Sequence, residues 1–207
     1  MSASLVGLMP LALTDRPGHP DAVETALRLG TQPLVHVVGR AHRAEDVIAR
    51  AASLRNFLLM EGVPDTADLV RLFARRLPAA RLGVVVNPFA PGEIDRLHAK
   101  AEAGAHFYVA QAGFDDRAYG QLLARGPRIT ALASALCIGP RLAEAIRRGR
   151  IPGVRLPPGI ATDQPIRRLA ARIRELCAMG FSGVHIAGIR RPESVRRLLA
   201  LLEKEGE

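Results

Sequence analysis

The residues with the clearest potential for chemistry lie between Lys100 and Asp115. A helix is expected to end at Lys100, residues 103–105 (Ala-Gly-Ala) to turn the chain, and His106–Ala110 to form a strand. Gln111 then stands at the carboxyl end of that strand, where parallel α/β proteins bind ligands. Its amide offers both a donor and an acceptor, so it can pair with the mixed polar edge of a heterocycle. The plainer interpretation is a generic helix-to-strand turn followed by a polar residue.

Apolar segments typical of buried strands alternate with amphipathic helical segments along the chain. The expected strands are Leu5–Met9, Leu34–Val38, Phe57–Met60, Leu82–Val86, His106–Ala110, Ile129–Leu132 and Gly183–Ala187. The expected helices are Glu45–Leu54, Ala67–Arg76, Asp115–Leu123, Arg141–Arg148, Gln164–Met179 and Pro192–Glu203, with others beginning near Pro20 and Pro91. This alternation indicates a parallel sheet covered by helices, either a barrel or a doubly wound sheet. No glycine-rich phosphate turn follows the first expected strand, which weighs against a dinucleotide-binding sheet.

Composition favours one globular domain over residues 1–207, because 48% of the residues are apolar. The chain is nevertheless shorter than the roughly 250 residues of a typical eight-stranded α/β barrel. The two cysteines, Cys137 and Cys177, have neither disulfide-framework nor metal-ligand spacing, so we expect a reducing, cytoplasmic environment and no metal. The apolar segment from Leu5 to Leu13 contains Pro10, lacks a basic flank and is too short to span a bilayer.

The formal net charge is +9, and 27 of the 29 basic residues are arginine. Most of these arginines, Arg168, Arg172 and Arg174 among them, fall in helical segments where a solvated face explains them. The alternative is attraction for a polyanion, such as nucleic acid or a polyglutamate tail. Aromatic residues make up only 4% of the chain, so stacking platforms for bases are scarce. Nucleic acid is therefore not an expected partner.

The segment from Lys100 to Asp115 resembles the signature of the methylenetetrahydrofolate reductase family. In that signature a lysine, an acidic residue and Ala-Gly-Ala precede a strand that is followed by glutamine and Phe-Asp. Weaker similarity covers nearly the whole chain, for example at Val35–Val38, Ala67–Val70 and Val84–Pro88. The resemblance implies a TIM-type (β/α) barrel and a role in one-carbon metabolism.

The resemblance also implies a binding site for a reduced folate or another pterin. Gln111 would bind the pterin, and the other substrate-binding residues expected are Phe114 and His36. Gly113 stands where the family usually has a bulky aromatic residue, so we expect a wider site there. By contrast, His106 and His185 are more simply explained as packing or hydrogen-bonding histidines.

A cofactor site is implied at Lys100, Arg40 and Asn87. Lys100 matches a family lysine near the flavin phosphates, and Arg40 offers charge to phosphates or to the glutamyl tail. Asn87, however, replaces a tyrosine that lies against the flavin ring, and Val63 replaces the aspartate that tunes the flavin. We therefore expect FAD to be absent or weakly held, with NAD(P)H as the hydride donor of any reaction.

The first strand of the family has no counterpart here. Aligning His36 with its family equivalent places Leu5–Met9 on the second family strand, so we predict a barrel of about seven parallel strands. The missing strand carries the family's proposed acid, and a general acid contributes typically about 10²–10⁴-fold in rate. Asp15 and Glu61 are the only candidate replacements. A missing strand also leaves unpaired strand edges, which predicts a homo-oligomer or a complex with a partner protein.

Two functions follow from the resemblance. The first is an oxidoreductase that reduces a methylene-pterin to a methyl-pterin with NAD(P)H. The alternative is a non-catalytic barrel that serves as a partner or regulatory subunit, which the missing acid and altered flavin contacts favour.

Overall fold

The computed structural model describes residues 10–12, 34–38, 44–51, 54–60, 65–151, 154–160, 162–189 and 192–203. The chain forms two compact units. The first comprises Met1–Val86, Gly92–Val109 and Gly126–Thr130, and the second comprises Asn87–Pro91, Ala110–Arg125 and Ala131–Glu207. The prediction of one domain over the whole chain is not tested by this division and stays a prediction.

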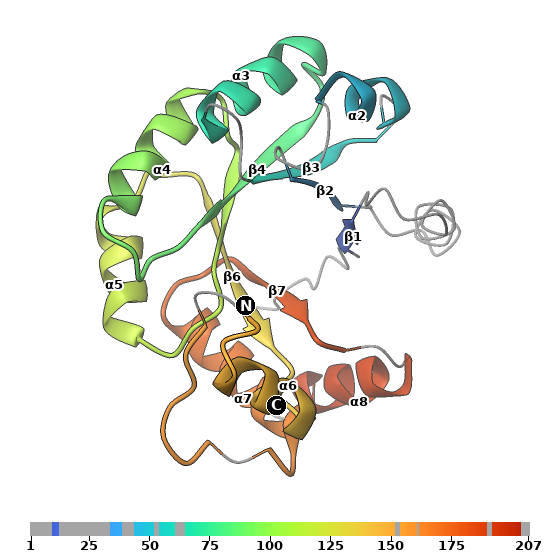
Figure 1. Ribbon diagram of the computed structural model, residues 1–207, viewed down its shortest axis with the longest axis vertical. Coiled ribbons are helices and arrows are strands. Elements are labelled where there is room, and N and C mark those ends of the chain that lie inside the picture. The colour runs from blue at the N-terminus through green and yellow to red at the C-terminus, as the bar shows by residue number, and fades with distance from the viewer. Residues whose placement is uncertain are drawn as a thin grey trace. The chain divides into compact units, whose positions relative to one another are not determined.

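The first unit is a parallel sheet whose strands alternate along the chain with helices (Figure 1). Its strands are β1 (Pro10–Ala12), β2 (Leu34–Val38), β3 (Asn56–Met60), β4 (Arg81–Val86) and most of β5 (Phe107–Ala110), ordered as in the chain. Its helices are α2 (Ala44–Ala51), α3 (Thr66–Arg76) and α4 (Glu93–Glu102). The register pairs Val35 with Phe57 and Phe57 with Leu82.

The core of the first unit lies between this sheet and its helices. Val35, Phe57 and Leu82 are fully buried, and the Phe57 ring meets Phe73 of α3 edge-on, with 5.4 Å between the ring centroids. Helix α3 begins at Thr66, one residue before the predicted start at Ala67. The Asp65 carboxylate caps it by accepting a hydrogen bond from the backbone N–H of Ala67 at 3.3 Å.

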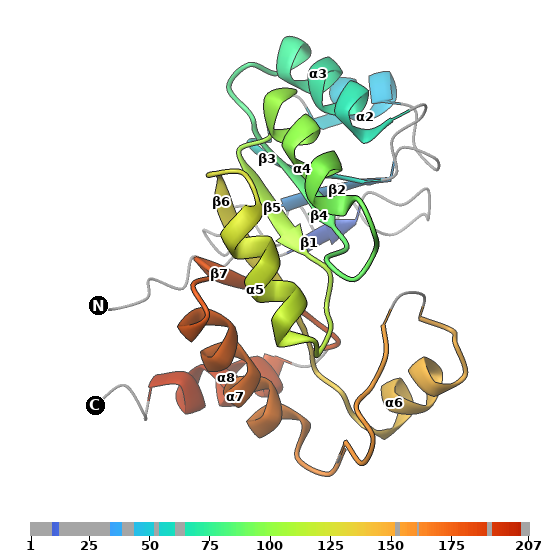
Figure 2. The ribbon, with the colours of Figure 1, turned by 90° about the vertical axis from the view of Figure 1, so that its left-hand side faces the viewer.

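The second unit contains α5 (Asp116–Arg125), all but the first residue of β6 (Thr130–Leu136), α6 (Pro140–Arg147), α7 (Pro165–Ala178), β7 (Gly183–Ala187) and α8 (Pro192–Glu203). Strands β6 and β7 are parallel, and their register pairs Ser134 with His185. The pairing continues beyond β6, where the backbone N–H of Cys137 donates to the carbonyl of Ala187 at 2.9 Å. Helices α7 and α8 pack side by side (Figure 2).

The parallel α/β organisation predicted from the sequence is confirmed. Strands β2 and β7 and helix α8 coincide with the predicted ranges, whereas β6 runs four residues past the predicted end at Leu132, because register with β7 continues to the pair Leu136–Ala187. The predicted strand Leu5–Met9 lies outside the described residues, and the three-residue β1 begins at Pro10, where we expected a connection.

Six described strands, β2 to β7, have four or more residues. The predicted closed barrel is not found in the described residues, because their strands form one sheet that runs from β1 to β7 and does not close into a full barrel. The missing first strand stays a prediction. Within the described ranges, each helix falls short of the length and apolar character that a membrane span requires.

Candidate functional site

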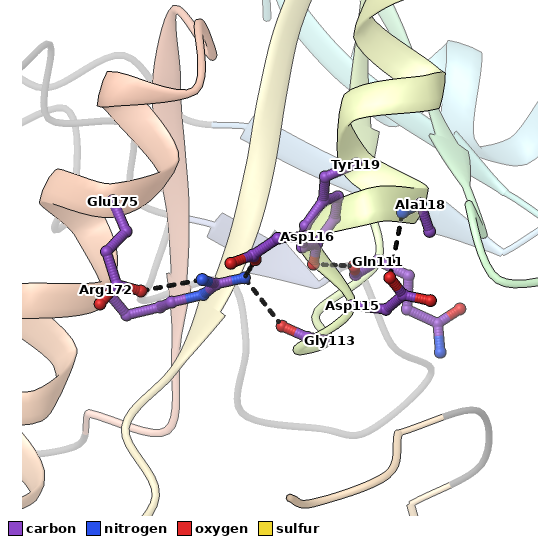
Figure 3. A network of polar contacts seen from close by, with 8 residues as sticks. All are labelled: Gln111, Gly113, Asp115, Asp116, Ala118, Tyr119, Arg172 and Glu175. Carbon is purple, nitrogen blue, oxygen red and sulfur yellow. Dashed lines mark hydrogen bonds and ion pairs between the residues drawn. The ribbon is translucent and has the colours of Figure 1, made fainter.

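Gln111 is the first residue after β5, a strand whose four residues are all buried. Its backbone carbonyl accepts a hydrogen bond of 2.7 Å from the hydroxyl of Tyr119 (Figure 3). Its side chain is half-buried and extends away from Arg172 in this view. Asp115 then caps the start of α5 by accepting from the backbone N–H of Ala118 at 3.1 Å. The segment from Gln111 to Asp116, which we call the Gln111 loop, is therefore held at both ends.

The turn before β5 also forms as predicted, with one shift. Helix α4 ends at Glu102 and not at Lys100. Gly104 then takes a φ of 112°, a conformation that favours glycine, and the N–H of Ala105 donates to the carbonyl of Lys100 at 3.1 Å. This hydrogen bond and the conformation of Gly104 end helix α4 and direct the chain into β5.

Lys100 itself is buried, with 7% of its surface exposed. Its ammonium donates to the backbone carbonyl of Val85 at 3.1 Å. Burial lowers the pKa of Lys100, although the carboxylates of Glu93 and Asp65 partly offset this effect. The cation thus has a partner in its own chain, and its role toward a cofactor phosphate stays a prediction.

The other predicted site residues are distributed over both units. Asn87 follows β4 and its side-chain oxygen accepts from the N–H of Phe89 at 3.1 Å, which shapes the turn there. His36 is half-buried on β2 in register with Leu58. Arg40 lies outside the described residues, as do Asp15, Glu61 and Val63. Of the predicted set, Gln111 and Phe114 share one loop.

The expectation that Gly113 widens the site is wrong, because Phe89 fills the space. A Cβ atom placed on Gly113 would lie 2.1 Å from Cζ of the Phe89 ring. Gly113 and Phe89 come from segments that are distant in the chain. In the structure they are complementary, since the aromatic ring that position 113 lacks is supplied by position 89.

Tyr119 lies at the centre of this packing and is fully buried. Its ring makes edge-on contacts with Phe89 and with Phe181, each with 5.5 Å between centroids. Burial raises the pKa of Tyr119 to about 12, so its hydroxyl stays protonated and donates to Gln111 at neutral pH.

The prediction of a solvated helix face is wrong for Arg172 of α7, because only 15% of its side chain is exposed. Its guanidinium lies 2.8 Å from Asp116, 2.8 Å from Glu175 and 3.4 Å from the carbonyl of Gly113 (Figure 3). A signal was present, because Arg172 stands three residues after buried Leu169, at the margin of the apolar face.

The two histidines behave as predicted, as hydrogen-bonding residues. His106 accepts through Nδ1 from the N–H of Leu82 at 3.1 Å. His185 has its Nδ1 3.5 Å from the hydroxyl of Ser134, and burial lowers its pKa. The part of the chain that the structure describes has no group of three or more histidine, cysteine, aspartate or glutamate side chains placed to hold a metal ion.

The described strands and helices define a parallel α/β fold. No protein-family model matches the chain, and no curated protein is significantly similar to it. Among solved structures, it is similar to the BexX/CysO complex of Amycolatopsis orientalis, with 13% identity, a TM-score of 0.54, and coverage of 94% of this chain and 76% of that one. It is also similar to a candidate phosphonomutase from Burkholderia cenocepacia J2315, with 18% identity, a TM-score of 0.52, and coverage of 93% and 78%. At these identities the similarity extends to the fold alone.

The pairing of Gly113 with Phe89 predicts a coupled effect on stability. Gly113→Ala should cost about 1–3 kcal/mol, because the new methyl group overlaps the Phe89 ring. In a Phe89→Ala background the same change should cost at least about 0.5 kcal/mol less. Denaturant unfolding of the four proteins measures both values. Gly120→Ala is the control, since a Cβ there meets nothing within 4 Å; equal costs of Gly113→Ala in the two backgrounds would contradict the pairing.

His185 predicts a loss of stability in mild acid. Its pKa in the folded protein lies below the ordinary 6.5, so the unfolded chain takes up the proton first as the pH falls. The free energy of unfolding should therefore fall below pH 6.5, by at most about 1.4 kcal/mol per pH unit from this group, and be unaffected by it at higher pH. His185→Asn should flatten this slope in unfolding measured from about pH 5 to 8.

Proposed function

We propose that this protein binds a reduced folate or another pterin, with Gln111 as the residue that pairs with the ring. The observation that supports this most is the placement of Gln111 directly after the buried parallel strand β5, with its backbone fixed by Tyr119. Parallel α/β proteins bind ligands at this end of their strands. The likeness of residues 100–115 to the methylenetetrahydrofolate reductase signature names the ligand class.

The chemistry of the amide suits this ligand. A pterin edge alternates hydrogen-bond donors and acceptors, and a primary amide presents one of each side by side. Partial burial strengthens such bonds relative to water. Phe114, half-buried in the same loop, would supply apolar surface to the ring. The role of His36 in substrate binding stays a separate prediction.

The proposed activity is an oxidoreductase reaction of one-carbon metabolism. A methylene-pterin, NAD(P)H and a proton would give a methyl-pterin and NAD(P)⁺. The hydride would form a C–H bond at the methylene carbon, one of the two C–N bonds of that carbon would break, and the proton would go to the nitrogen released. Arg40 would offer positive charge to the phosphates of NAD(P)H or to the glutamyl tail of the ligand. Lys100 and Asn87 are the other proposed cofactor contacts.

A second candidate, a non-catalytic partner or regulatory subunit, is favoured by the contacts of Lys100 and Asn87. Both side chains bond to backbone groups of their own chain, at Val85 and Phe89, and Phe89 fills the space beside Gly113. These contacts suit a site that holds a pterin without FAD.

Substitution of Gln111 tests the proposed function. Gln111→Ala should weaken reduced-folate binding by on the order of 1–3 kcal/mol, because the polar ring edge would be left without its partner. Isothermal titration with folate, its methylene form and its methyl form measures the change. Gln121→Ala is a matched control, since that glutamine is exposed on α5. Folded protein that gives no heat with any of the three ligands would rule the proposal out.

The second candidate carries a prediction about assembly. If the sheet has unpaired edge strands, the chain should self-associate or require a partner, since such edges are otherwise left without hydrogen bonds. Light scattering on the purified chain measures its mass. A monomer that remains stable over a wide concentration range would remove the main reason to expect a homo-oligomer.

A further inference from the structure

We infer that Arg172 is a positioning residue, which fixes the Gln111 loop in the conformation that presents Gln111 to its ligand. This inference rests on the proposed function for the ligand, but its structural part concerns only contacts within the second unit. Arg172 lies on α7, far along the chain from the loop, so its contacts are tertiary and not a consequence of local turn chemistry.

The contacts of Arg172 reach both sides of the loop. One terminal nitrogen donates to the Asp116 carboxylate at 2.8 Å and to the carbonyl of Gly113 at 3.4 Å. The other donates to Glu175, one turn along the same helix, at 2.8 Å. The guanidinium carbon also lies 5.9 Å from the Phe114 ring centroid and 5.7 Å from that of Tyr119. Three residues of the loop are thus tied to one side chain.

Two carboxylates stabilise the positive charge of the half-buried Arg172 side chain. Burial by itself would lower the pKa of Arg172, but hydrogen bonds and charge from Asp116 and Glu175 raise it above its ordinary value. Only Asp116 belongs to the loop. Glu175 therefore orients the guanidinium, and Asp116 and the carbonyl of Gly113 accept its hydrogen bonds in the loop.

The planar guanidinium is the group that this arrangement needs. It can donate along several fixed directions at once and can lie against aromatic rings, whereas a lysine ammonium is a compact point charge. Tyr119 connects this cluster to the ligand residue, because its ring faces Arg172 and its hydroxyl holds the carbonyl of Gln111. Arg172 and Tyr119 together fix the loop from Gln111 to Asp116.

Hydrogen exchange of the loop amides measures this role without any ligand. Arg172→Gln should raise the exchange rates of residues 111–116 about ten-fold or more, as expected for easier local opening, while the core of the second unit exchanges as before. Asp116→Asn should act in the same direction. Glu175→Gln, which leaves the loop contacts in place, should act less, and Arg172→Lys should fall between wild type and Arg172→Gln.

Titration then tests the link to the ligand. Arg172→Gln should lower affinity for a reduced folate about ten-fold, with Gln111 still present, since the loop must be ordered before it binds. Arg168→Gln is the matched control, because Arg168 lies one turn earlier on α7 in an exposed pair with Asp163 at 3.4 Å.

The outcomes are distinct. Faster exchange confined to the loop, with weaker binding, supports the inference. Faster exchange throughout the unit, or unchanged exchange in the loop, overturns it. If wild-type protein binds no folate, the proposed function fails, while the exchange rates alone still decide whether Arg172 fixes the loop.

Discussion

Tyr119 packs its ring against Phe89 and Phe181 and donates its hydroxyl to the carbonyl of Gln111. The other features of the site depend on this placement. The ring can be buried only because the hydroxyl has a partner, since an unbonded buried hydroxyl is costly. The same bond sets the direction in which the chain leaves β5. The Tyr119 side chain therefore both fills the core and orients the backbone at Gln111.

Each of the two units has a buried or half-buried cation that donates to a backbone carbonyl. Lys100 gives its ammonium to the carbonyl of Val85, and Arg172 gives its guanidinium to Gly113 and to two carboxylates. Lys100 joins helix α4 to strand β4, and Arg172 joins helix α7 to the Gln111 loop. Most basic residues of the chain are arginines, and surface ion pairs such as Arg71–Asp68 are half-exposed and contribute little to stability. By contrast, Lys100 and Arg172 have structural roles.

Much of the fold could be predicted because it depends on local periodicity. The apolar segments Leu34–Val38 and Gly183–Ala187 are strands as predicted, and Asp65 caps its helix. The position of Gln111 after β5 followed from the same pattern. The pairing of Phe89 with Gly113 and the inward position of Arg172 could not be predicted, because both depend on contacts between segments distant in the chain. Periodicity places Arg172 at the margin of a helix face, whereas its part-buried position depends on contacts with Gly113 and Asp116. Solved structures under 20% identical support the fold and leave the ligand to be tested.

The most direct test of the central claim observes the Gln111 amide itself. In protein labelled with nitrogen-15, the side-chain NH₂ resonances of Gln111 can be assigned by comparison with Gln111→Ala and followed as a methyl-form reduced folate is added. If Gln111 binds the pterin, its resonances should shift in a saturable way while those of Gln121 stay in place. Saturable binding that leaves the Gln111 amide unperturbed would contradict it.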